Sequence, residues 1–361
     1  MRHPPFLGPY ASRLVPIALV LTAASAPWAA SRSEAAEPVA LRVDSFAVSP
    51  AHTPSAVVHV KNLTQACYEG VVRVKAPAGW SLKMEQQSVA LAAGDTKQLR
   101  YLVQRGVAVE ENSYSLEVSA AGAGATVAHR QNVAAASAPY FKPQVDGDAS
   151  DWKDAIPVTW TTRAKATTVS TYWNRKQFAV LIAVAEDRLV PLEAGGSSRT
   201  FDAVQLAISS HDAPTDSAPD GDAGRYEFLL APTSPSAGRC FLLAIPGTRL
   251  AQTQSVRELE ALAYGDAELA VWRKDGITYY ECAVPFKLIR DDIPPGEGRE
   301  FCLSVLVHDP DGTGIRDWGE AAGLWPWQRN RLAWSQWQGA AWGERPPFDN
   351  KTPWGMCSSK Y

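Results

Sequence analysis

Residues 56–77 read AVVHVKNLTQACYEGVVRVKAP, and this stretch decides the fold class. Apolar and polar residues alternate in residues 56–63 and again in residues 70–77, which is the pattern of strands with one buried face. Gly, Pro and Asn turns separate such runs, and the alternation recurs in residues 41–48, 97–104, 113–120 and 126–133. Residues 39–136 are therefore predicted to form an antiparallel β-sandwich.

The composition favours a globular protein with more than one core. The chain has 361 residues, for which two domains are the natural expectation. Hydrophobic residues make up 46% and charged residues 20%, so there is enough apolar surface to bury. With 35 basic and 38 acidic residues, the net charge of -3 shows no basic excess. Nucleic acid is therefore not an expected partner.

The N-terminus has the pattern of a secretory signal. Arg2, His3 and Arg13 precede an apolar run, LVPIALVLTAASA, at residues 14–26, and small residues follow it. Residues 1–36 are predicted to be a signal peptide and spacer. No later apolar run is long enough to span a bilayer. The expected location is the periplasm, the cell surface or the medium.

Five cysteines are present, and export would permit disulfides between them. The odd number predicts that at least one is free or pairs with another chain. Cys282 and Cys302 lie in two strand-like runs and could face each other. The alternative is that both are small buried hydrophobic residues.

A linker, AAASAPYFKP at residues 134–143, separates the first sandwich from a second domain at residues 140–358. It is followed by VDGDASDW at residues 145–152. This segment is typical of a strand end, a tight glycine turn, acidic residues that cap it and a tryptophan that closes over the core.

The second domain resembles the family 9 carbohydrate-binding modules, also described as DOMON-like sandwiches. The similarity begins at VDGDASDW and continues through VSTYWNRKQFAVLIAVAED, TFDAVQLAIS, a hairpin at Asp275-Gly276, YECAVPF, EFCLSVLVHDPDG and DNKTPWG. The first domain resembles the Ig-like domain attached to α-galactosidases, through APAGW at residues 76–80 and LAAGDTKQLRYLV at residues 91–103. The predicted fold class is all-β, with two antiparallel β-sandwich domains.

The C-terminal segment is unusually rich in tryptophan, with seven of the chain's 13 Trp: Trp318, Trp325, Trp327, Trp334, Trp337, Trp342 and Trp354. Planar aromatic rings beside amide, guanidinium and carboxylate groups suit a flat, hydroxylated ligand such as a sugar. The alternative is that these Trp cover the end of the sandwich.

The resemblance implies a sugar held between two aromatic faces. Trp342 is the best match for the family's second Trp, Trp334 and Trp337 are its neighbours, and Trp325 or Trp327 could serve as a single platform. The loop EAGGSSRTFD, at residues 193–202, lacks the family's first Trp and offers Phe201 as its aromatic residue. The polar candidates for hydroxyl contacts are Arg331, Gln205, Arg225 and Glu227, and the family usually has Glu at the position of Gln205.

The resemblance also implies structural calcium. Two acidic turns, DGDASD at residues 146–151 and HDPDG at residues 308–312, supply hard oxygen ligands at close spacing. The candidate ligands are Asp146, Asp148, Asp151, Asp309 and Asp311. The alternative is that these carboxylates only cap turns.

The sequence contains no Gly-x-Ser-x-Gly, His-Glu-x-x-His or phosphate-loop motif. No catalytic activity is therefore predicted, and the resemblance implies non-catalytic carbohydrate binding, accessory to polysaccharide catabolism. The expected partners are a polysaccharide or oligosaccharide, with a glycoside hydrolase or a cell-envelope component beside it. The alternatives are a cell-surface structural or adhesion protein, and a haem-carrying DOMON-type domain with Met356 or His308 as an axial ligand.

Overall fold

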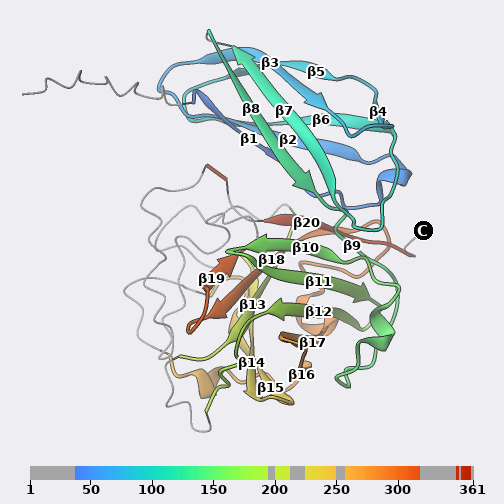
Figure 1. The fold of residues 1–361 in the computed structure, drawn as a ribbon, viewed down its shortest axis with the longest axis vertical. Coiled ribbons are helices and arrows are strands. Elements are labelled where there is room, and N and C mark those ends of the chain that lie inside the picture. Colours follow the sequence, from blue (N-terminus) through green and yellow to red (C-terminus); the bar gives the residue numbers. More distant parts are fainter. Residues whose placement is uncertain are drawn as a thin grey trace, which may run out of the picture. The chain divides into compact units, whose positions relative to one another are not determined.

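The computed structural model describes residues 37–122, 124–193, 200–211, 224–248, 257–317, 347–348 and 351–358. In these ranges the chain forms four β-sheets (Figure 1). The helical elements described are three short 3₁₀ turns and the single-turn helix α1 (Phe286–Ile289). None of the helices described is long and apolar enough to cross a membrane. The all-β fold class is confirmed.

The first two sheets form a sandwich around one apolar core. One sheet contains β1 (Val39–Val43), β2 (Ser55–Asn62), β6 (Thr96–Arg105) and β4 (Ser81–Leu82), and the other contains β5 (Gln86–Leu91), β3 (Tyr68–Lys75), β7 (Tyr114–Gly122) and β8 (Ala125–Val133). The alternation predicts the buried face correctly, since Val58 and Val60 of β2 and Val72 and Val74 of β3 lie in the core. The predicted run at residues 41–48 is too long, because β1 ends at Val43.

The other two sheets form a second sandwich. The first, called here the β12 sheet, has the order β10 (Val158–Thr162), β11 (Lys165–Trp173), β12 (Gln177–Ala185), β17 (Ile277–Pro285) and β16 (Glu268–Lys274). The second, called the β13 sheet, has the order β15 (Ala237–Ala244), β14 (Tyr226–Ser234), β13 (Ala203–Ser210), β18 (Glu300–Asp309), β20 (Thr352–Met356) and β9 (Ser137–Ala138), with β19 (Gly314–Asp317) beside β18. Neighbouring strands are antiparallel except β20 and β9, which are parallel.

Two turns of the second sandwich form as their residues predict. The side chain of Asn174 accepts hydrogen bonds from the backbone N–H groups of Lys176 (2.8 Å) and Gln177 (3.2 Å), so it closes the turn between β11 and β12. Asp275 and Gly276 have φ angles of 52° and 77°, which a tight hairpin between β16 and β17 requires.

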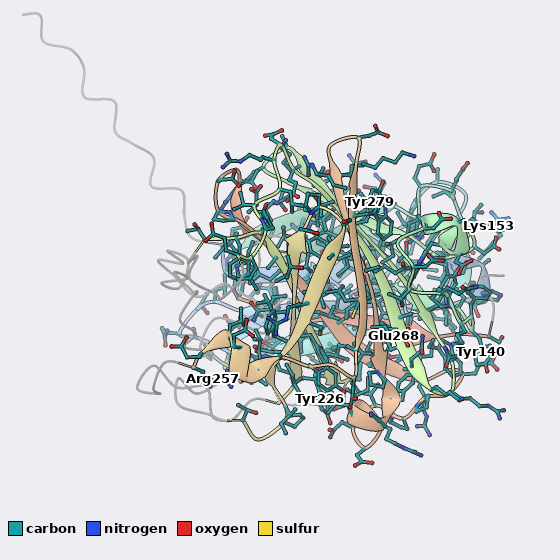
Figure 2. All side chains as sticks on the ribbon, turned by 90° about the horizontal axis from the view of Figure 1, so that it is seen from below. Tyr140, Lys153, Tyr226, Arg257, Glu268 and Tyr279 are labelled. Carbon is teal, nitrogen blue, oxygen red and sulfur yellow. The ribbon has the colours of Figure 1, made fainter. Side chains whose placement is uncertain are left out.

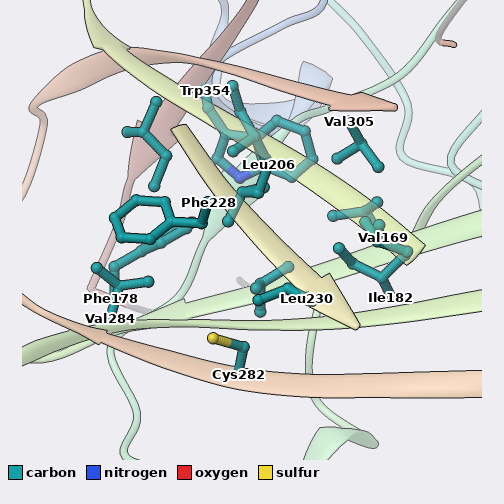
Figure 3. Packing of buried hydrophobic residues seen from close by; sticks show 14 of the residues in the cluster. Val169, Phe178, Ile182, Leu206, Phe228, Leu230, Cys282, Val284, Val305 and Trp354 are labelled. Carbon is teal, nitrogen blue, oxygen red and sulfur yellow. The ribbon is translucent and has the colours of Figure 1, made fainter. Parts of the chain in front are cut away.

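The core of the second sandwich lies between the β12 and β13 sheets and includes a tryptophan of the Trp-rich segment (Figure 3). Trp354 is fully buried among apolar side chains from both sheets. Its indole N–H donates a hydrogen bond to Oγ1 of Thr171, on the facing β11, at 2.8 Å. Trp354 is therefore a packing residue that joins the two sheets.

No disulfide joins the described cysteines, and Cys240, Cys282 and Cys302 are buried. Cys282 on β17 and Cys302 on β18 belong to different sheets and are not bonded to each other. The thiol of Cys282 faces Cys240 instead. A hydrogen bond with Cys240 and burial together raise the pKa of Cys282.

The segment at residues 145–152 packs on the outer face of the β12 sheet. Trp152 lies in a small apolar cluster with Tyr172 and Leu181, away from the main core. Its Nε1 donates a hydrogen bond of 2.8 Å to Oε1 of the buried Glu281. The backbone N–H groups of Asp146 (3.2 Å) and Gly147 (3.0 Å) donate to Oε2 of the same carboxylate. One buried side chain on β17 thus holds the whole turn.

Replacing Glu281 with alanine is expected to lower the free energy of unfolding by about 2 kcal/mol, because three donors lose their acceptor. Urea unfolding measures the loss. The matched control is Glu268→Ala on β16, whose side chain is exposed (Figure 2) and whose removal should cost less than about 0.5 kcal/mol. Equal losses in the two variants would contradict an anchoring role for Glu281.

Candidate functional site

The candidate site lies on the face of the β13 sheet that points away from the core. On β13, Val204 and Leu206 face the core, so Gln205 lies on the opposite side. The same alternation on β14 and β18 places Glu227 and His308 beside it. We call this surface the polar face, and its polar residues are Gln205, Ser209, Arg225, Glu227, Ser304 and His308, all buried.

Four of these residues form a chain of hydrogen bonds. Nε of Arg225 donates to Oε1 of Glu227 at 2.6 Å, and Nε2 of Gln205 donates to Oε2 of the same carboxylate at 3.3 Å. The ring Nε2 of His308 lies 3.0 Å from Oε1 of Gln205. Because an amide oxygen can only accept, His308 must carry its proton on Nε2. The chain therefore runs from His308 through Gln205 to the carboxylate of Glu227.

Burial sets the charge states in this chain. It lowers the pKa of His308 to about 4, so this imidazole is neutral at pH 7. It also raises the pKa of Glu227, against the lowering effect of Arg225. A third charged group, Arg257, interacts with Glu227 and donates a hydrogen bond to the backbone oxygen of Leu243 at 2.8 Å.

Two serine hydroxyls extend the polar face along the sheet. The Oγ atoms of Ser209 on β13 and Ser304 on β18 are buried and have no hydrogen-bond partner in the described part of the chain. Buried hydroxyls normally have a partner. The polar face therefore carries hydroxyl, amide, carboxylate, guanidinium and imidazole groups on or next to β13 and its two neighbours, β14 and β18. Its two serine hydroxyls remain available for hydrogen bonds.

An apolar cluster borders the polar face at the far end of the sheet. Leu229 and Ala231 of β14 and Phe241 and Leu243 of β15 pack there with Phe201. Phe201, the aromatic residue of the loop at residues 193–202, is only 1% exposed. It is therefore a packing residue and offers no free ring face for a ligand.

The structure brings the described sequence candidates together. Gln205, Arg225 and Glu227 are hydrogen-bonded neighbours on one surface. The other predicted sugar contacts, Trp325, Trp327, Trp334, Trp337, Trp342 and Arg331, lie outside the described residues. The sequence did not point to Ser209 and Ser304, and it predicted His308 only as a candidate haem ligand. The signal was available in EFCLSVLVHD, where Ser304 and His308 alternate with core residues.

The carboxylates lie close together at only one of the two predicted acidic turns. The carboxylates of Asp146, Asp148 and Asp151 accept backbone hydrogen bonds from within their own segment, at 2.9–3.1 Å. In the described ranges they do not converge as a group of ligands. Asp309 and Asp311 do converge, together with Asp202, which sequence reasoning did not identify. One oxygen from each of the three lies within 4.8 Å of the others.

The two candidate haem ligands, Met356 and His308, have different surroundings. Met356 is buried in the core between the sheets. His308 lies on the opposite face of the β13 sheet and is hydrogen-bonded to Gln205. The two side chains therefore lie on opposite sides of one sheet, Met356 in the core and His308 in the hydrogen-bonded chain of the polar face.

No model of a protein family matches the chain, and no curated protein matches it. Among solved structures, a family 9 carbohydrate-binding module from Caldicellulosiruptor kristjanssonii in complex with cellotriose is 12% identical, with a TM-score of 0.36 over 62% of this chain and 93% of that one. A family 9 module from the same organism with glucose is 12% identical, with a TM-score of 0.31 over 48% and 78%. The E. coli chaperone DraB is 10% identical, with a TM-score of 0.21 over 59% and 95%. Similarity at this level leaves the function to be argued from the residues of this chain.

Proposed function

We propose that the polar face binds a carbohydrate and that the protein is a non-catalytic carbohydrate-binding protein. The observation that carries the proposal is the set of buried hydrogen-bonding groups on the side of the sheet away from the core, with Gln205 and His308 at one end, Ser209 and Ser304 at the other, and the apolar Ala207 and Leu306 between them. A sugar presents both donors and acceptors around its ring. This set offers the same mixture within a small area.

The chemistry of each group fits a hydroxyl ligand. The carboxylate of Glu227 can accept a hydrogen bond from a sugar hydroxyl, and Arg225 can donate to one. Gln205 can do both. The hydroxyls of Ser209 and Ser304 have no described partner and would gain one on binding. Planar amide and guanidinium groups are common contacts for the ring hydroxyls of sugars in such sites.

The sequence also offers tryptophan side chains that could stack on the sugar while the polar face binds its hydroxyls. The Trp-rich segment follows β19 directly in the chain and contains Trp325, Trp327, Trp334, Trp337 and Trp342. The resemblance to family 9 modules assigns Trp342 to the ligand. Phe201 is buried, so it cannot serve as the family's first aromatic contact, and the sugar is expected to stack on a single ring face. A dissociation constant of about 1 mM is therefore expected.

The cellular role proposed with this activity is that of an exported accessory to polysaccharide breakdown. The N-terminal segment supports export, and the resemblance of both domains to modules of secreted glycosidases supports the link to a hydrolase. The competing candidate is a structural or adhesion protein of the cell surface. The low exposure of the polar face favours that candidate, since a satisfied buried network can serve packing alone.

Glycan binding by the purified protein tests the proposal. Affinity electrophoresis and calorimetry would survey polysaccharides, oligosaccharides and monosaccharides for the wild type and for Gln205→Ala, Trp342→Ala and the exposed control Glu268→Ala. We expect at least one glycan to bind, and each of the first two variants to weaken its binding about tenfold or more. Thermal unfolding checks that each variant still folds.

Two results would overturn the proposal. Failure of the folded wild type to bind any glycan would favour the structural candidate. Binding that Gln205→Ala leaves unchanged would place the carbohydrate site away from the polar face.

A further inference from the structure

Two buried cysteines meet in the core of the second sandwich, away from the polar face. Cys240 lies on β15, the outermost described strand of the β13 sheet, and Cys282 lies on β17, next to β16 in the β12 sheet. Both belong to the apolar core cluster, and they are 6% and 0% exposed. Figure 3 shows the side chain of Cys282 pointing from β17 into this core. The two residues therefore lie on facing sheets of one sandwich.

The register of the β12 sheet places Cys282 beside Leu269. Leu269 on β16 pairs with Cys282 on β17, and Val271 pairs with Tyr280. Paired residues of antiparallel strands project from the same face of a sheet. Leu269, Val271 and Cys282 thus all face the core, and the two β16 side chains mark where Cys282 lies.

The facing strand β15 approaches these side chains closely. A Cβ added to Gly238 of β15 would lie 2.5 Å from Cγ2 of Val271 and 3.0 Å from Cδ2 of Leu269. Only glycine therefore lets β15 pack this tightly on β16. Gly238 and Cys240 are two residues apart and share the core face of the strand. The close approach of the strands brings Cys240 toward the position that Cys282 occupies beside Leu269.

The two thiols interact directly. A hydrogen bond with Cys240 is the largest cause of the raised pKa of Cys282, and burial adds to it. Tyr264 gives a second indication, because its backbone N–H donates to the backbone oxygen of Cys240 at 2.9 Å. Burial raises the pKa of the Tyr264 hydroxyl, and Asp266, Cys240 and Cys282 raise it further. Both sulfur atoms therefore lie near the same tyrosine side chain.

We infer that Cys240 and Cys282 form a disulfide that joins the two sheets of the second sandwich when the chain folds in an oxidising compartment. The two thiols lose two protons and two electrons as one S–S bond forms between their sulfur atoms. A small disulfide such as oxidised glutathione accepts both and is cleaved to two thiols. Because buried thiols react slowly, the bond must form while the chain folds. The inference is independent of carbohydrate binding.

Cys302 provides a contrast within the same sandwich. It is also buried, but it pairs with Ser209 across β18 and β13 and so lies on the same side of the sheet as the polar face. Its neighbours Phe301 and Leu303 are the residues of β18 that face the core. A bond between Cys282 and Cys302 would have to cross the β13 sheet. Cys302 is therefore a matched control for the proposed pair.

Oxidative folding followed by peptide mapping tests the disulfide. The wild type would be folded once with reduced and oxidised glutathione and once with dithiothreitol, and free thiols would be alkylated after denaturation. We expect three of the five cysteines to be alkylated in the oxidised sample and all five in the reduced one. Mass spectrometry should find Cys240 linked to Cys282. The oxidised protein should melt roughly 5–10 °C above the reduced protein.

Two variants make the result specific to the pair. Cys282→Ala should melt at the same temperature in both conditions, whereas Cys302→Ala should keep the linked peptide and the difference in melting temperature. Comparing the two conditions within each variant cancels the effect of the substitution on packing. Five free thiols in the oxidised wild type would overturn the inference, and so would a bond between Cys282 and Cys302. Because no glycan is present in these measurements, their failure would leave the proposed carbohydrate site untouched.

Discussion

Replacing Trp354 with alanine should lower the free energy of unfolding by about 3–5 kcal/mol. The side chain is fully buried between the two sheets of the second sandwich, and its N–H is bonded to Thr171. The substitution removes a large apolar surface, opens a cavity and leaves the Thr171 hydroxyl without its donor. Urea or thermal unfolding of the purified protein measures the loss.

Two variants make this result specific to the position. Trp354→Phe keeps most of the volume and loses the hydrogen bond, so it should cost about half as much or less. Trp272→Ala removes a half-buried indole on the outer face of the β12 sheet, whose ring centroid lies 4.9 Å from that of Tyr279. That loss should be close to about 1 kcal/mol. A small effect of Trp354→Ala would show that this indole is not part of the core.

Trp354 also shows why the role of a single tryptophan in the Trp-rich segment could not be predicted from its composition. The Trp-rich segment left ligand contact and packing open for each of its members, and its last Trp is a packing residue. Sequence could not make this distinction, since an indole between polar neighbours looks the same in a core strand and on a binding surface. What decides is the register of β20 against β18, where Trp354 pairs with Phe301.

Much of the fold could be predicted because alternation is local. Each run of alternating residues in the first sandwich shows which side chains face the core. The pair Asp275-Gly276 likewise predicts the hairpin between β16 and β17. In the first sandwich, the strands that were not predicted are short or polar. β4 has two residues, and β5 begins with Gln86, Gln87 and Ser88, which hide its alternation.

The sites were harder to predict because they depend on pairing between distant strands. Gln205 and Glu227 could be proposed singly, but only the register between β13 and β14 makes them neighbours. Asp202 and Asp309 are 107 positions apart in the sequence and meet only because β13 pairs with β18. Acidic residues close together in sequence, such as Asp146 and Asp148, instead capped their own turn.

Arg225→Met is expected to produce a loss as large as that of Trp354→Ala, about 3–5 kcal/mol at pH 7. Arg225 and Glu227 are 1% and 0% exposed, and the guanidinium lies 2.6 Å from the carboxylate. Removing the guanidinium leaves a buried negative charge without its nearest positive partner. Methionine has a similar length and keeps the packing, so the measured loss reports chiefly on charge. Urea unfolding of the variant gives the value.

The double variant Arg225→Met, Glu227→Met separates charge from shape. With both charged groups replaced, most of the loss should return, because an apolar pair avoids the desolvation that the ion pair must offset. If the double variant were as unstable as the single one, packing would be responsible instead of charge. The comparison of the two variants also bears on function. If an apolar pair stabilises the fold as well as Arg225 and Glu227 do, stability gives no reason for the charged pair, and ligand binding becomes the better explanation.

The pH dependence gives a second, independent reading of the same pair. Burial already raises the pKa of Glu227 above its ordinary value of 4.5, and loss of Arg225 raises it further. In Arg225→Met the folded protein therefore holds a proton that the unfolded chain releases above about pH 4.5. Stability of the variant must fall as the pH rises above that value, by up to about 1.4 kcal/mol per pH unit, and its deficit against the wild type must shrink toward pH 4.5. A deficit that is constant between pH 4.5 and 7 would mean that Glu227 stays protonated with or without its arginine, and the polar face would then offer a ligand a neutral carboxyl group.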